Sequence, residues 1–162
     1  MAKQKVIATK ATKNPPPPPH RKSPQKVAVA ILIYNISTKY LKECVDSVLN
    51  QTNQNFEILL VDNGSTDLAC KEMAKDYVCS DSRITLLHKR INEGATTGRE
   101  LVISYFKGEI QAKHTKKENE LSIFEITTEN IYNIDFIHKN TEEKSLAKPD
   151  ADYITFLDSD DV

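Results

Sequence analysis

VAVAILIY, at residues 27–34, is an unbroken apolar run rich in β-branched side chains, with an asparagine directly after it. A run of this length and composition is typical of a strand that is buried on both faces, as in a parallel sheet covered by helices. Three similar runs follow at residues 56–61, 84–87 and 153–157. The sequence therefore predicts four buried strands.

The segments between these runs have the periodicity of helices. Apolar residues over 40–49 recur one and four positions apart, which places one apolar stripe along a helix. A looser stripe predicts a second helix over about 67–77, with Ser65 or Thr66 as its N-cap, and a third helix continues over 100–106. Alternating strands and helices imply right-handed crossovers. The predicted fold class is therefore a doubly wound α/β fold with a mostly parallel sheet and helices on both faces.

Charge divides the chain of 162 residues into two parts. Residues 1–26 hold seven basic residues, no acidic residue and the proline run 15–19, which is held in an extended conformation that cannot join a core. Residues 27–162 hold the other fifteen basic residues and all 23 acidic ones, a net charge of −8. The sequence predicts a disordered arm and one acidic domain, and it argues against nucleic acid as a partner.

Two interpretations of the arm remain open. A basic segment gains about 1 kcal/mol per Lys or Arg near an anionic lipid surface, so the arm is a candidate for peripheral contact with the inner face of the plasma membrane. The simpler alternative, which we favour, is a solvated tail. Cys44, Cys70 and Cys79 lack metal-site spacing and suit a reducing cytoplasm, and no apolar run approaches the roughly 20 residues of a membrane span. The expected location is cytoplasmic.

Polar clusters follow three of the predicted strands. They are Tyr34-Asn35, then residues 62–65 (Asp-Asn-Gly-Ser), and finally residues 158–161 (Asp-Ser-Asp-Asp). In open parallel sheets, ligands bind beyond the carboxyl ends of the strands. The clusters therefore predict a binding site at this edge, although a solvated turn explains any one of them, and Tyr34 alone is equally consistent with core packing.

The acidic cluster carries most of the chemistry. Three carboxylates within four residues repel one another unless a cation neutralises them, and oxygen ligands favour Mg²⁺ or Mn²⁺. Such an ion completes its shell with substrate phosphates, so a nucleotide diphosphate is the expected ligand. The alternative is a helix start, where Asp is also favoured. The position directly after a buried strand favours the metal site. P-loop, dinucleotide-loop and nucleophile-elbow signatures are absent.

Taken together, these motifs resemble the nucleotide-binding half of family-2 glycosyltransferases, which have the GT-A fold. The similarity covers residues 26–109 and 151–162, and any single motif within it is weak. The matching segments, all in the order of the family, are 27–35, 40–52, 55–58, 61–67, 92–94 with Arg99, and 153–161.

The resemblance implies an inverting sugar transfer from a UDP-sugar or another nucleotide-sugar donor, with a divalent Mn²⁺ or Mg²⁺. It implies a glycan or lipid-linked acceptor, as in bacterial-type surface polysaccharide or lipopolysaccharide synthesis. The residues that it assigns are Tyr34 on the base, Asp62 and Asn63 near base and ribose, Arg99 near the nucleotide, Asp158 at ribose and diphosphate, and Asp160 with Asp161 at the metal.

The largest departure from the family is an insertion over about residues 110–150. We expect it to enter at the amino edge of the sheet, opposite the catalytic edge, and therefore not to select the acceptor. Ile131, Ile134 and Ile137 recur every three residues and predict a short helix that packs on the body. Such insertions are usually tolerated decoration, with a partner surface as the alternative.

The resemblance also implies a second half beyond residue 162, with the acceptor site and the general base that an inverting displacement needs. No catalytic base is therefore named, and the domain at 27–162 is predicted to be truncated after the DxD strand and inactive alone. The main hypothesis is a glycosyltransferase. The alternative is a truncated, non-catalytic nucleotide-sugar-binding remnant, whereas a sugar nucleotidyltransferase is disfavoured because its Gly-rich signature is absent after the first strand.

Overall fold

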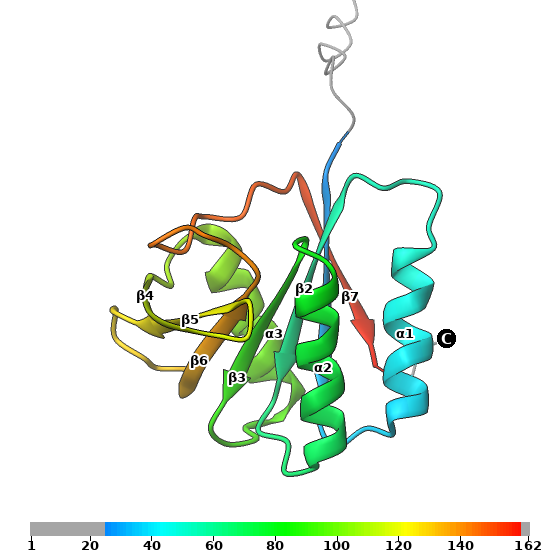
Figure 1. Ribbon diagram of the computed structural model, residues 1–162, viewed down its shortest axis with the longest axis horizontal. Helices are drawn as coiled ribbons and strands as arrows, with labels where there is room; N and C mark the ends of the chain where they lie inside the picture. The colour runs from blue at the N-terminus through cyan, green and yellow to red at the C-terminus, as the bar shows by residue number, and fades with distance from the viewer. Residues whose placement is uncertain (1–24, 160–162) are drawn as a thin grey trace, which may run out of the picture.

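The structure is a computed structural model, and it describes residues 25–159 (Figure 1). Most of the predicted basic arm, residues 1–24, lies outside the described residues, as do Asp160 and Asp161. The disorder of the arm, its contact with lipid and the role of these two carboxylates therefore stay predictions. Within residues 25–159, no helix is long and apolar enough to cross a membrane.

Seven strands form one sheet in the order β4-β5-β6-β3-β2-β1-β7. The four predicted strands are β1, β2, β3 and β7, and they are all parallel. The prediction that all four are buried is wrong for β7, which lies at the edge of the sheet and has mostly exposed residues. In chain order the elements are β1 (Val27–Ile33), α1 (Thr38–Leu49), β2 (Phe56–Asp62), α2 (Leu68–Ser80), β3 (Ile84–Lys89), α3 (Gly94–Lys107), β4 (Ala112–Glu118), β5 (Leu121–Ile126), β6 (Ile134–Lys139) and β7 (Tyr153–Asp158).

Helices cover both faces of the parallel part, as predicted. In Figure 1, α1 and α2 lie in front of the sheet and α3 lies behind it. Alternate residues of β1 therefore enter different cores: Val29 and Ile31 point to opposite faces from Ala28 and Ala30, and each set joins a separate buried cluster. The doubly wound α/β class is confirmed.

The inserted segment was predicted wrongly. Residues 131–137 do not form a helix, because Ile134 begins β6, which pairs antiparallel with β3. A β-bulge near Lys89 adds one residue to β6, so that Ile134 and Ile137 share the buried face on the α3 side, while Ile131 is 63% exposed. The three-residue spacing thus comes from a bulged strand, which periodicity alone does not distinguish from a helix.

The insertion also extends further than we predicted. Its two ends do lie at the amino edge of the sheet, where Asp152 donates its backbone N–H to Lys26 at 2.8 Å. However, β6 begins beside the carboxyl end of β3, where the backbone N–H of Arg90 donates to the Asn133 carbonyl at 2.9 Å. The insertion therefore reaches from the amino edge of the sheet to its carboxyl edge, and its 130–135 segment lies at the border of the predicted site.

The helix starts differ slightly from the sequence prediction. The N-cap of α2 is Asp67, whose carboxylate accepts from the Cys70 backbone N–H at 2.8 Å, and not Ser65 or Thr66. This leaves the Ser65 and Thr66 hydroxyls for other contacts at the carboxyl edge. The third helix begins at Gly94, earlier than its apolar stripe indicated, and its first turn therefore belongs to the same edge.

Candidate functional site

A pocket of about 400 Å³ opens at the carboxyl edge of the parallel strands. It brings together Tyr34 after β1, Asn63 after β2, and Asp158 with Ser159 at the end of β7. Asn92, Gly94 and Ala95 close one side with the first turn of α3. Three of the residues assigned from sequence thus line one cavity, whereas Asp62 and Arg99 lie beside it.

Tyr34 is a surface residue at this pocket. Its side chain is 50% exposed, so core packing does not account for it. The next residue, Asn35, has a φ of 46°, a left-handed conformation that Asn tolerates better than most side chains. Its carboxamide oxygen accepts from the backbone N–H groups of Thr66 and Asp67 at 2.8 and 2.9 Å. These bonds join the loop after β1 to the loop after β2.

Asn63 presents a buried amide to the pocket. Its Nδ2 donates to Asn92 Oδ1 at 3.1 Å and to the Gly94 carbonyl at 3.2 Å, which settles which end of the amide is which. Its Oδ1 is buried and has no hydrogen-bond partner among the described residues. A buried polar atom without a partner costs free energy, so this acceptor is a candidate for a ligand donor.

Asp62 is 3% exposed and does not line the pocket. Its Oδ1 accepts from the Ser65 backbone N–H at 2.9 Å, and its Oδ2 lies 3.3 Å from Nδ1 of His88. Burial disfavours the charged carboxylate, but the hydrogen bonds from His88 and Ser65 outweigh burial and keep the pKa of Asp62 below its usual range. The carboxylate therefore stabilises the loop that carries Asn63.

This lowered pKa predicts a pH dependence of stability. The contribution of Asp62 is fully present above its unfolded pKa of about 3.9 and is lost as the pH falls toward its folded pKa. We expect Asp62→Asn to flatten the slope of unfolding free energy against pH below about pH 4. The measurement is urea unfolding of both proteins from pH 6 downward.

Asp46 serves as the control for this comparison, because hydrogen bonds from Lys42 and Tyr77 also lower its pKa, but it lies on α1 away from the site. Asp46→Asn removes one carboxylate with a lowered pKa without touching the loop that carries Asn63. Equal slopes for wild type and Asp62→Asn would show that the Asp62 carboxylate does not contribute, and the assignment of its hydrogen bonds would be wrong.

Asp158 and Arg99 form an ion pair across the pocket mouth. Arg99 Nη2 donates to Asp158 Oδ1 at 3.2 Å, and about half of each side chain is exposed. The pair joins α3 to the end of β7, and the Cys44 thiol donates to the Asp158 carbonyl at 3.7 Å from α1. Asp158 is thus held by contacts from both helical layers.

Asp158 is compatible with a metal site but does not complete one. Its carboxylate is the kind of ligand that Mg²⁺ and Mn²⁺ favour, and it is 55% exposed beside the pocket. Within residues 25–159 there is no cluster of three His, Cys, Asp or Glu side chains that would hold an ion. The two other carboxylates, Asp160 and Asp161, lie outside the described residues, so the metal site stays a prediction.

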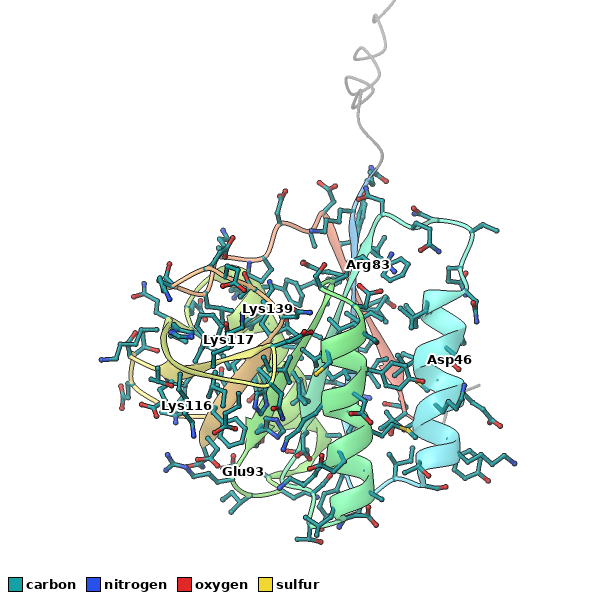
Figure 2. The ribbon with its side chains drawn as sticks, viewed as in Figure 1. Asp46, Arg83, Glu93, Lys116, Lys117 and Lys139 are labelled. Carbon is teal, nitrogen blue, oxygen red and sulfur yellow. The ribbon has the colours of Figure 1, made fainter. Side chains whose placement is uncertain are left out.

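Several residues of this edge were not singled out from sequence. Lys89 has a fully buried side chain, and its Nζ lies 3.0 Å from Oε2 of Glu93, just before α3 (Figure 2). Asn133 of the insertion donates to Glu93 Oε1 at 3.1 Å. Lys89 and Asn133 together hold the pKa of Glu93 below its usual range. The sequence pointed to Glu93 only through the Asn92-Glu93-Gly94 motif. Nothing in the sequence distinguishes Lys89 and Asn133 from other polar residues.

Comparison with known sequences decides the family. Residues 28–112 match the sequence model of Glycosyl transferase family 2, which covers more than half of the chain. This chain belongs to glycosyl transferase family 2. The pocket residues Tyr34, Asn63, Asn92 and Gly94 fall inside the matched segment, whereas Asp158 and most of the insertion fall after it.

Relatives of this chain include glycosyltransferases of bacteria. The chain is 43% identical over 83 residues to glycosyltransferase GlyG of Streptococcus pneumoniae, 51% of this chain and 27% of GlyG. It is 35% identical over 108 residues to a glycosyltransferase of Rickettsia bellii, 62% of this chain and 15% of that protein. It is 35% identical over 82 residues to glycosyltransferase EpsJ of Bacillus subtilis, and the matched segment covers 51% of this chain and 23% of EpsJ.

The family-2 chain described here spans between 15% and 27% of the length of these three relatives. Its seven-stranded mixed sheet, with a parallel core that alternates with helices, agrees with the GT-A fold that the resemblance implied.

Proposed function

We propose that this chain binds the nucleotide sugar of a glycosyltransferase reaction in the pocket at the carboxyl edge. The observation that carries the proposal is the convergence of Tyr34, Asn63 and Asp158, from the ends of three parallel strands, on one cavity of about 400 Å³. A cavity of this size, lined by an aromatic ring and a few polar groups, suits a cofactor-sized ligand.

The polar groups of the pocket support a uracil base and hence a UDP-sugar. Tyr34 offers an exposed ring face, and stacking of a base on an aromatic side chain contributes about 1–3 kcal/mol. Uracil also carries one ring N–H donor, for which the unpartnered Oδ1 of Asn63 is the matching acceptor. Asp62 acts behind Asn63 by fixing the loop.

The first turn of α3 supplies groups that suit the diphosphate. Ala95 brings the N-terminus of α3 to the cavity, where backbone N–H groups and the helix dipole favour phosphate, while the Gly94 N–H already donates to Asn92 Oδ1 at 2.8 Å. Arg99 adds a positive charge next to Asp158. In this proposal Asp160 and Asp161 hold Mn²⁺ or Mg²⁺, and the ion neutralises charge on the leaving diphosphate.

For the whole protein we propose transfer with inversion to a glycan or lipid-linked acceptor, in bacterial-type surface polysaccharide or lipopolysaccharide synthesis. This rests on family membership and on the resemblance. The general base that deprotonates the acceptor hydroxyl is not assigned to any residue of this chain. Cytoplasmic location, with the basic arm of residues 1–26 against the membrane, belongs to the same proposal.

Calorimetry with UDP, with and without Mn²⁺, tests the donor site. We expect wild type to bind UDP more tightly with Mn²⁺, Asp160→Ala to lose that metal dependence, and Tyr34→Ala to lose about tenfold in affinity under both conditions. Asp76→Ala, an exposed carboxylate on α2, is the control and should bind as wild type. The proposal fails if folded wild type binds no UDP in the presence of Mn²⁺.

A further inference from the structure

Three buried polar side chains form a continuous line of contacts from the end of β2, next to the loop that carries Asn63, to the insertion. Oδ2 of Asp62 on β2 lies 3.3 Å from Nδ1 of His88 on β3, and Nε2 of His88 lies 2.9 Å from Nδ1 of His138 on β6. All three residues are at most 4% exposed. They lie on the sheet face that α2 covers, and His138 belongs to the insertion.

The acceptor at one end fixes the direction of these hydrogen bonds. An ionised carboxylate only accepts, so Nδ1 of His88 carries a proton and donates to Asp62. A neutral imidazole carries a proton on only one of its nitrogens, so Nε2 of a neutral His88 is unprotonated and accepts from Nδ1–H of His138. Burial lowers the pKa of His138 to about 4, which leaves that ring neutral at pH 7 with its single proton on Nδ1.

The surroundings of His138 hold its ring in place. Phe136 packs against both imidazoles, with ring centroids 4.4 Å from His88 and 5.0 Å from His138. Beyond His138 lies a cavity of about 300 Å³ between α2 and the insertion. The charged groups that line it are Lys75 of α2, Lys116 and Glu118 of β4, Glu125 of β5 and Asp135 of β6.

From Asp62 the contacts continue into the pocket. The Asp62 carboxylate accepts from the Ser65 backbone N–H, and the Ser65 hydroxyl accepts from the Asn35 backbone N–H at 3.0 Å. Asn35 follows Tyr34, and Asn63 follows Asp62, so both pocket residues are attached to this network. A change in the bonding of His88 therefore acts on the loop that shapes the pocket.

We propose that His138 is a positioning residue for the donor site: its Nδ1–H keeps His88 in the tautomer that donates to Asp62, and Asp62 then holds the loop that carries Asn63. The inserted strand thereby becomes part of the donor site without touching the ligand. The link to nucleotide binding rests on the proposed function, whereas the link from His138 to His88 and Asp62 does not. Family residues alone do not supply it, because β6 lies after the matched segment.

Two matched variants separate hydrogen bonding from packing. Leu and Asn have the same branched skeleton, so His138→Leu and His138→Asn both replace the ring by a non-aromatic side chain that branches at the same atom. The Asn amide still places an N–H donor about where Nδ1 of His138 lies, whereas Leu offers none. Long-range ¹H–¹⁵N NMR of the full chain reports which ring nitrogen of His88 carries the proton, and calorimetry reports UDP affinity with Mn²⁺.

We expect a proton on Nδ1 alone of His88 in wild type and in His138→Asn. In His138→Leu no donor faces Nε2 of His88, so we expect Nε2 to carry a proton as well as Nδ1. UDP affinity should fall about three- to tenfold in His138→Leu, the range of one hydrogen bond, and stay within about twofold of wild type in His138→Asn. An unfolding curve for each variant shows whether it folds. If one variant does not fold, the other is compared with wild type alone.

Wild-type His88 with protons on both nitrogens would overturn the proposal, as would equal UDP affinity in wild type and folded His138→Leu. If wild type binds no UDP at all, the proposed function fails. The NMR comparison of the variants then still decides whether His138 sets the bonding of His88, so the two failures are distinguishable.

Discussion

Phe124→Ala is expected to lower the free energy of unfolding by about 3–5 kcal/mol, the cost of deleting a buried aromatic ring. Phe124 lies on β5 within the insertion and is fully buried. It belongs to the same buried cluster as Val61 of β2 and Leu101 and Val102 of α3, which are part of the family fold. Its loss therefore leaves a cavity in the core shared by the insertion and the parallel sheet.

Ile131→Ala is the matched control for this prediction. Ile131 is also an apolar residue of the insertion, but it is 63% exposed, so its truncation should change stability by less than about 0.5 kcal/mol. Urea unfolding monitored by circular dichroism gives both values. An insertion that is only decoration would unfold in a separate early transition and leave the main midpoint of Phe124→Ala unchanged, contrary to our expectation.

The parallel core could be predicted from sequence because each of its strands is a mostly apolar run. The strand at 27–33 contributes buried residues to both faces of the sheet, and the sheet with its two helical layers follows from that property. The insertion could not be predicted in the same way. Its strands mix charged and apolar residues, and the bulge in β6 gives Ile134 and Ile137 the spacing of a helix.

The candidate site was predicted in part for a similar reason. Tyr34 and Asn63 follow buried strands and Asp158 ends the exposed edge strand β7, but all these strands are parallel, so the common edge of the three residues follows from topology. Side-chain orientation does not follow from topology: Asp62 points away from the pocket to His88, and Asn63 faces it. His88 and His138 gave no signal, since 50 residues separate them and each fits an ordinary strand.

Gly64→Ala is expected to lower the free energy of unfolding by about 2–5 kcal/mol and to weaken UDP binding, for two separable reasons. Gly64 has a φ of 78°, and a side chain in this region costs about 1–2 kcal/mol. A Cβ atom there would also lie 2.6 Å from the Ile91 carbonyl carbon and 2.7 Å from the Asn92 nitrogen. Both are backbone atoms, so no side-chain rotation relieves the clash, and overpacking adds about 1–3 kcal/mol.

Gly94→Ala isolates the first of these reasons. Gly94 has a similar φ of 89°, but a Cβ there meets no atom within 4 Å, so only the backbone conformation is penalised, at about 1–2 kcal/mol. The difference between the two variants in denaturant unfolding is then the cost of pushing residues 91–92 away from the loop after β2. Because Asn92 Oδ1 accepts from Asn63, that displacement also moves the amide that we assign to the base. Equal losses of stability in the two variants would mean that the 91–92 segment yields freely, and the close approach at Gly64 would then not define the pocket.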